Sequence, residues 1–158
     1  MKYIVPNNYG WIEAKLSQEQ LDHIWDCIKT AKGGSYKRSL IGQIDKSFEI
    51  KDKNNYLWKN LIFKLVTAYG ERFSHGHTRI PIEGDWKPYL ADMWVNYQNA
   101  TEYNPTHDHG GVYSFAAWLK QPVDYIDQSK IYNAKDANGS YNNTFNFQYQ
   151  DIFGETAT

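Results

Sequence analysis

The chain has 158 residues, 41% of them apolar, which is typical of one globular domain over residues 1–158 with its own core. A formal net charge of −1 without a long basic run argues against general affinity for nucleic acid or for an anionic membrane. Cys27 is the only cysteine, which excludes an internal disulfide, and no apolar run approaches the roughly 20 residues of a membrane helix, so we expect a soluble cytoplasmic protein.

Residues 1–88 are predicted to be a helix-rich support region. Ser17 and Gln20 form a capping-box pattern that predicts the start of a helix, and the glycine pair at 33–34 predicts its end. Apolar side chains recur between them at helical spacing, at Leu21, Ile24, Trp25 and Ile28. His23 falls on the polar side of this helix, so we expect it to be solvated.

A second amphipathic helix is predicted from about Asn55 to Phe73. Its apolar residues repeat every three to four positions, at Leu57, Trp58, Leu61, Ile62, Leu65, Val66 and Tyr69. The stretch that follows contains His75-Gly76-His77, whose glycine and polar neighbours indicate a loop more than a metal site. The two helices are expected to pack as a layer against a sheet.

Residues 89–158 have the pattern of antiparallel strands. Alternation over residues 90–98 predicts a strand with one buried face. Residues 112–119 are nearly all apolar, as in a strand covered on both faces, and residues 144–150 alternate cleanly. The inward side chains of this last strand are expected to be Phe145, Phe147 and Tyr149. Helices followed by strands predict an α+β fold.

The polar loop between the first two of these strands contains two histidines, His107 and His109. In an extended backbone, residues i and i+2 point to the same side, so both imidazoles can face one ion. Histidine is the commonest protein ligand of Zn, Fe, Cu and Ni. The pattern predicts a metal site on His107 and His109, although such a pair is as often solvated loop sequence.

Several stretches of the chain resemble one enzyme family. The central motif reads Trp94-Val95-Asn96-Tyr97, then Asn104-Pro105-x-His107-x-His109, then Ser114-Phe115-x-x-Trp118-Leu119-Lys120-x-Pro122. It is similar to the phage-type and marine-bacterial group of 2-oxoglutarate/Fe(II)-dependent oxygenases, relatives of the prolyl hydroxylases, and residues 40–47 and 145–154 resemble the same group. The resemblance implies an antiparallel double-stranded β-helix (jelly roll) with N-terminal helices packed on it, Fe(II) as cofactor and 2-oxoglutarate as cosubstrate.

The resemblance also implies roles for individual residues. His107 falls at the position of the first metal ligand, and His109 stands where the wider superfamily has aspartate. A regular backbone favours the pair His107 and His109, whereas a β-bulge would bring in Asp108, the carboxylate between them. The residues that match the cosubstrate pocket are Tyr97, Ser114 and Trp118, each of which also fits a structural core position.

The sequence departs from the family after His109. No histidine and no arginine follow it, so the family's distal histidine and its basic 2-oxoglutarate partner have no counterpart. Lysines remain, but a lysine lacks the bidentate fork of arginine. We therefore expect a jelly roll that is incomplete at its C-terminus, with an open strand edge that a homo-oligomer would cover.

Three interpretations stay open. The first is an oxygenase that hydroxylates a small molecule or a protein, in the host cytoplasm if the chain is phage-encoded. The second is a non-catalytic jelly-roll module, a structural or interaction protein of phage type. The third, a cupin-like metal protein, fits least, because cupins place a glutamate after the histidine pair and this chain has residues 110–114, Gly-Gly-Val-Tyr-Ser, instead.

Overall fold

The computed structural model describes residues 1–3, 10–31, 40–73, 84–85, 87–122, 127, 130, 145–151 and 153–157. The chain groups into two compact units. The first unit is Trp11–Phe115, and the second combines Met1–Gly10 with Ala116–Thr158. The boundary at Phe115 falls inside the stretch that the sequence predicts to be one apolar strand.

The first helix, α1, spans Gln18–Lys29 and begins as predicted. The Ser17 hydroxyl accepts a hydrogen bond from the backbone N–H of Gln20, and the Gln20 side chain accepts one from the backbone N–H of Ser17. This capping box satisfies two amide groups that the first helical turn leaves unpaired. The helix ends at Lys29 with Thr30 as its cap, ahead of the predicted glycine pair at 33–34, which lies outside the described residues.

The second predicted helix is present but is not uniform along its length. A 3-10 turn, η2, spans Lys53–Asn55, a π-helical stretch, η3, spans Trp58–Ile62, and α2 spans Phe63–Arg72. Together these segments lie close to the predicted bounds. A π-helical stretch inserts an extra residue into a helical turn and so shifts the apolar face of the helix; here Ile62 is buried and Leu61 is half-buried.

Two short antiparallel strands form the sheet of the first unit. β1 spans Lys46–Glu49 and β2 spans Trp94–Tyr97, with Phe48 opposite Val95. Because side chains alternate along a strand, the sheet has two faces. The first face carries Lys46, Phe48, Val95 and Tyr97. The second face carries Ser47, Glu49, Trp94 and Asn96.

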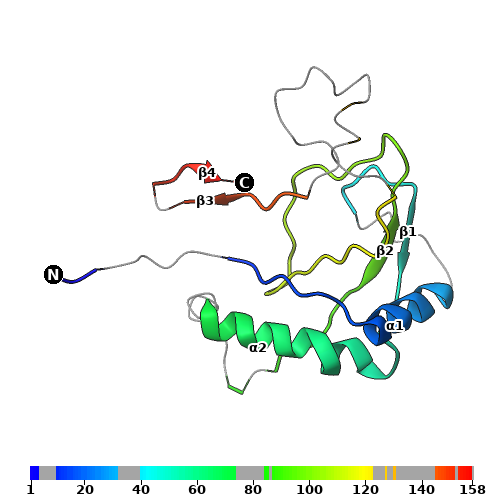
Figure 1. Ribbon diagram of the computed structural model, residues 1–158, viewed down its shortest axis with the longest axis horizontal. Coiled ribbons are helices and arrows are strands. Elements are labelled where there is room, and N and C mark those ends of the chain that lie inside the picture. The colour runs from blue at the N-terminus through cyan, green and yellow to red at the C-terminus, as the bar shows by residue number, and fades with distance from the viewer. Residues whose placement is uncertain are drawn as a thin grey trace. The chain divides into compact units, whose positions relative to one another are not determined.

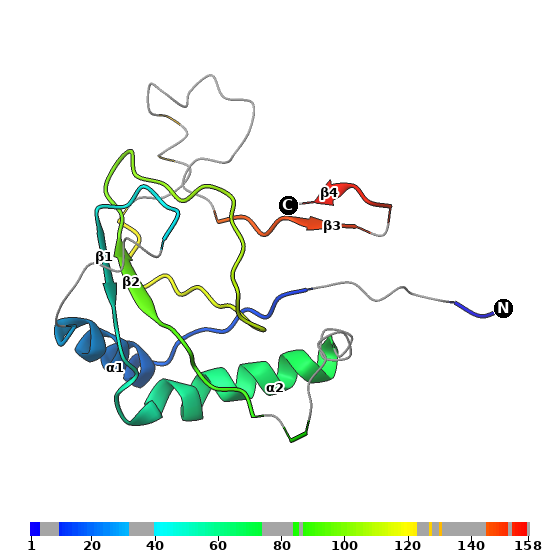
Figure 2. The ribbon, with the colours of Figure 1, turned by 180° about the vertical axis from the view of Figure 1, so that it is seen from behind.

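The core of the first unit combines residues from the helices with residues that flank the two strands. Its buried apolar residues are Ile24, Cys27, Ile28, Ile44, Ile50, Leu57, Ile62 and Met93. Figures 1 and 2 show α1 beside the β1–β2 ribbon from both sides of the molecule. On the second face Ser47 is only 1% exposed, and its hydroxyl donates to Oδ1 of Asn96 at 2.7 Å. This bond joins the two strands through their side chains.

The second unit contains a short hairpin. β3 spans Tyr149–Gln150 and pairs in antiparallel fashion with β4, Thr156–Ala157. The predicted strand over residues 144–150 is therefore reduced to its last two residues within the described part. Phe145 and Phe147, expected to face inward, are exposed. Apolar and polar residues alternate here, but among residues 145–150 only the last two are paired in a strand.

The strand predicted over residues 112–119 is wrong. These residues have no strand partner within the described part of the chain, and Val112, Phe115 and Trp118 are exposed. A strand requires a neighbour that pairs with its backbone amides and carbonyls, and apolar composition does not supply one.

The broad fold class, α+β, is confirmed. The strands of the described residues form two separate two-stranded antiparallel sheets and no closed barrel, so the double-stranded β-helix is not confirmed. The sequence also missed β1, which lies in a stretch of mixed, polar residues between the two predicted helices.

Candidate functional site

The two histidines of the predicted metal site lie side by side on the loop that follows β2. The ring centroids of His107 and His109 are 4.8 Å apart, and the rings meet edge to face. Both side chains are exposed, and the backbone that carries them is a loop and not a strand. The spacing of two residues thus brings the imidazoles together even without regular strand geometry.

The loop itself holds the first imidazole. Nδ1 of His107 lies 2.7 Å from the carbonyl oxygen of Pro105. A carbonyl only accepts, so Nδ1 carries the proton and donates, which leaves the lone pair of the neutral ring on Nε2. Histidines that bind metals through one nitrogen commonly donate the other N–H in this way. His107 is therefore in the tautomer suited to a metal ligand at Nε2.

The second imidazole is held by a tryptophan of the sheet. The ring of His109 stacks on that of Trp94, with centroids 5.8 Å apart and 29° between the planes. Trp94 is the first residue of β2 and pairs with Glu49 of β1. The stack restricts the orientation of a side chain that would otherwise rotate freely in solvent.

Glu102 ties the beginning of this loop to the entrance of β1. Its carboxylate accepts the backbone N–H of Asn99 at 2.7 Å and that of Asp45 at 2.9 Å. The hydrogen bond from Asn99 lowers the pKa of Glu102 most, and the hydrogen bond from Asp45 lowers it further. Loss of hydration raises the pKa by less, so the net pKa lies below its usual value. Beside it, the backbone N–H of Gln43 donates to the carbonyl of Tyr103 at 2.9 Å, which forms an isolated bridge.

A glycine allows the histidine segment to approach the strand entrance closely. An ideal Cβ placed on Gly42 would overlap Oδ1 of Asn104. The Asn104 side chain thus occupies the space that any larger residue at position 42 would need. Because Asn104 begins the segment that leads to His107, this contact helps to place the loop.

Tyr113 fixes the far side of the loop to α2. Its ring meets that of Tyr69 edge to face, with centroids 5.6 Å apart. Burial, reinforced by Tyr69, raises the pKa of the Tyr113 hydroxyl above its usual value. The sequence pattern does not predict Trp94 and Tyr113 as anchors of the loop, although both are aromatic residues of the strand-like stretches that flank the histidine pair.

The described residues supply no third donor next to the histidines. No group of three His, Cys, Asp or Glu side chains that could share a metal ion occurs in the described part of the chain. Asp108, the alternative ligand, is exposed. The second pair, His75 and His77, lies outside the described residues. The metal-binding roles of His107 and His109 accordingly stay predictions.

Of the three predicted cosubstrate residues, Tyr97 points away from the histidine pair. Tyr97 is three residues from Trp94 on β2, so its side chain points to the face opposite the Trp94–His109 stack. Ser114 is exposed in the first unit, and Trp118 belongs to the second unit. Their cosubstrate roles stay predictions as well.

His23, expected to be solvated, instead belongs to a partly buried cluster. Its Nε2 lies 2.9 Å from Oδ1 of Asp52 and 3.4 Å from Sγ of Cys27. Both neighbours meet the same nitrogen, whereas a catalytic relay uses the two ring nitrogens separately. Asp52 also accepts the backbone N–H groups of Leu57 and Trp58. The cluster is structural, and no sequence pattern predicts it, because Asp52 is 29 residues from His23.

Comparisons with protein-family models, with curated proteins and with solved structures give no match. Among the helices that the structure describes, none is long and apolar enough to cross a membrane. The functional assignment therefore depends on the geometry of the histidine loop and on its motif.

Proposed function

We propose that the chain is an Fe(II)/2-oxoglutarate-dependent oxygenase in which His107 and His109 bind the metal. The observation that carries this proposal is the proximity of the two imidazoles, 4.8 Å between centroids, on an exposed loop. The Pro105 carbonyl orients one ring and Trp94 orients the other. Ligands that are held in place before the metal arrives bind it more tightly than mobile ones.

The donor chemistry fits part of an Fe(II) site. Neutral imidazole is a suitable ligand for Fe(II), and a site of two histidines and one carboxylate leaves positions for cosubstrate and oxygen. Among the described residues no carboxylate is grouped with the two histidines, so the pair supplies two of the three protein ligands of such a site. Bound Fe(II), with 2-oxoglutarate, supplies the oxidising chemistry, while the chain supplies binding and orientation.

The cosubstrate side of the proposal comes from the family resemblance. In it Tyr97, Ser114 and Trp118 contact 2-oxoglutarate within a double-stranded β-helix, and the substrate is a small molecule or a protein of the cytoplasm. In the described structure Tyr97 faces away from the histidine pair, so this arrangement requires the loop to move on binding. An experiment can therefore disprove cosubstrate binding by these residues without disproving metal binding by the histidines.

Anaerobic calorimetry with Fe(II), with and without 2-oxoglutarate, tests both parts. We expect saturable binding that strengthens with 2-oxoglutarate and disappears in His107→Ala/His109→Ala. The matched control is His75→Ala/His77→Ala, which removes the other His-x-His pair and should bind as the wild type does. No binding by the folded wild-type chain would exclude an oxygenase site, and equal losses in both double variants would exclude the assignment to His107 and His109.

A non-catalytic interaction module is the second candidate, because one observation favours it. In the second unit, Trp118 meets Phe145 edge to face at 5.0 Å, and Phe145 meets Phe147 at 4.9 Å, while all three rings are exposed. Exposed aromatic clusters are typical of protein interfaces. Here a homo-oligomer would bury this cluster, and Phe147→Ser should then lower the mass measured by light scattering without changing Fe(II) binding.

A further inference from the structure

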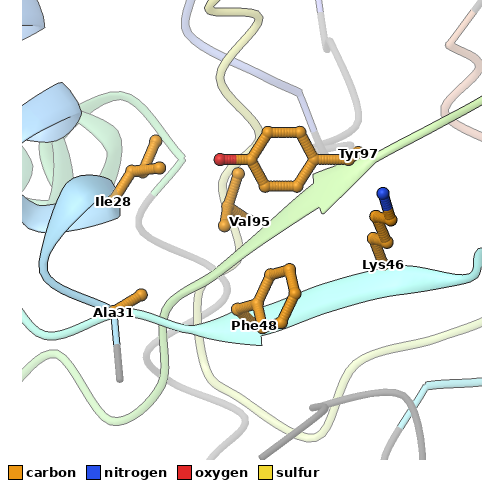
Figure 3. A pocket seen from close by; sticks show the side chains of 6 residues that line it. All are labelled: Ile28, Ala31, Lys46, Phe48, Val95 and Tyr97. Carbon is orange, nitrogen blue, oxygen red and sulfur yellow. The ribbon is translucent and has the colours of Figure 1, made fainter. Parts of the chain in front are cut away.

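The first unit contains a cavity on the face of the sheet that points away from the histidine stack. Its volume is about 380 Å³, within the range of small-molecule sites. Figure 3 shows the residues that line it. They are Ile28 from α1, Ala31 just after that helix, Lys46 and Phe48 from β1, and Val95 and Tyr97 from β2.

The lining is mostly apolar, with one charged group, Lys46, and one hydroxyl, that of Tyr97. Ile28, Ala31, Phe48 and Val95 offer only carbon atoms from their side chains, and the Tyr97 ring stands edge to face with that of Phe48 at 6.1 Å. Lys46 is exposed, and no ion pair with another described residue occupies its ammonium group. In Figure 3 Lys46 lies on one side of the aromatic rings, and Ile28 and Ala31 lie on the other.

We propose that this cavity binds a small monocarboxylate with an apolar body. The carboxylate pairs with the ammonium group of Lys46, and the body lies against Phe48 and Val95 toward Ile28. A lysine at the rim of an otherwise apolar cavity selects an anionic group at one end of the ligand only. This binding site is separate from the proposed metal site, because it includes neither His107 nor His109.

A dicarboxylate fits this lining poorly. With its first carboxylate on Lys46, its second would find no cation among the lining residues and only the Tyr97 hydroxyl as a side-chain donor, so it gains less from this lining than an apolar group does. The cavity therefore discriminates against 2-oxoglutarate, although Tyr97 is part of its wall. The proposed ligand thus differs from 2-oxoglutarate, the dicarboxylate that the family resemblance assigns to Tyr97.

Calorimetry of the full chain with octanoate, without added metal, tests the proposal. We expect saturable binding, and binding of the neutral octanamide that is about three- to tenfold weaker because it lacks the charge. Lys46→Met removes the charge but keeps most of the stem, and should weaken octanoate binding by a similar factor. Lys51→Met, an exposed lysine just beyond β1 that does not line the cavity, is the matched control and should bind normally.

Filling the cavity provides a second test that leaves the charge in place. Ala31→Leu adds carbon atoms to the α1 side and should also weaken octanoate binding, with the thermal midpoint confirming that the variant is folded. Absence of saturable octanoate binding, equal binding by Lys46→Met, or displacement of octanoate by equimolar 2-oxoglutarate would each overturn the proposal. Because no Fe(II) is present, these outcomes are independent of the oxygenase assignment.

Discussion

The imidazole of His109 stacks on the indole of Trp94, with ring centroids 5.8 Å apart. Trp94 belongs to β2, whereas His109 lies on an exposed loop. The stack therefore restricts the motion of the His109 side chain relative to the sheet. Trp94 thereby acts as a positioning residue for the proposed metal site without itself contacting the metal.

Removal of this stack should weaken metal binding. In Trp94→Ala, His109 loses the surface that orients it, and we expect the affinity for Fe(II) to fall by about tenfold, as for other residues that orient a ligand. Trp94→Phe keeps an aromatic face and should retain most of the affinity. Calorimetry at fixed pH measures both values.

The control for this prediction is Trp11→Ala. Trp11 is exposed in the same unit, and its indole N–H donates to Glu13, far in sequence from the histidine loop. Its replacement should leave the affinity unchanged. A folded Trp94→Ala protein that binds Fe(II) as tightly as the wild type would show that the stack does not position His109.

Features that depend on neighbouring residues could be predicted from the sequence. The start of α1 depends on Ser17 and Gln20, three residues apart, and the two hydrogen bonds form as expected. The His107–His109 pair likewise follows from a spacing of two residues. In both cases the interacting groups are within one turn or one loop, so short-range geometry determines the contact.

Features that depend on distant partners could not be predicted in this way. Residues 112–119 have the composition of a buried strand, but a strand also needs a partner elsewhere in the chain, and the described residues provide none. His23 meets Asp52 across 29 residues, which no periodicity reveals. Alternation shows that Trp94 and Tyr97 point to opposite faces, but only the fold shows which face the histidine loop covers.

Enlarging Gly42 should disturb the loop. A Cβ at this position would overlap the Asn104 side chain, so Gly42→Ala must displace it, and we expect a loss of about 1 kcal/mol in the free energy of unfolding. Urea denaturation measures this loss. Gly110→Ala is the matched control, because a Cβ there meets nothing within 4 Å.

The double variant Gly42→Ala/Asn104→Ala identifies the cause of that loss. If the overlap with Asn104 is responsible, truncating Asn104 should recover part of the stability. Equal stability of Gly42→Ala and Gly110→Ala would contradict the close contact.

Replacing Asp52 should destabilise the helical segment that follows it. The Asp52 side chain is 3% exposed and accepts the backbone N–H of Leu57 at 3.0 Å and that of Trp58 at 2.9 Å. Asp52→Ala leaves these donors and His23 without their acceptor, so we expect a loss of about 2 kcal/mol in the free energy of unfolding. Asp22→Ala, an exposed aspartate on α1, should change stability by less than about 0.5 kcal/mol in the same denaturation experiment.

The Glu102 carboxylate should make stability depend on pH in the acidic range. Its pKa in the folded chain lies below the usual value of 4.5, because the backbone N–H groups of Asn99 and Asp45 bind the charged form. The folded state therefore binds this proton more weakly than the unfolded state does. The stabilisation is complete above the usual pKa and is lost as the pH falls through the lower, folded value.

Comparison with Glu102→Gln isolates this contribution. The amide cannot titrate, so the variant should be less stable than the wild type at about pH 6, and the difference should shrink toward about pH 3, where the wild-type carboxyl is increasingly protonated. Urea midpoints at the two pH values measure the effect, with Glu71→Gln on the exposed side of α2 as the control. A constant difference between wild type and Glu102→Gln at both pH values would mean that the hydrogen bonds from Asn99 and Asp45 do not depend on the charge of Glu102.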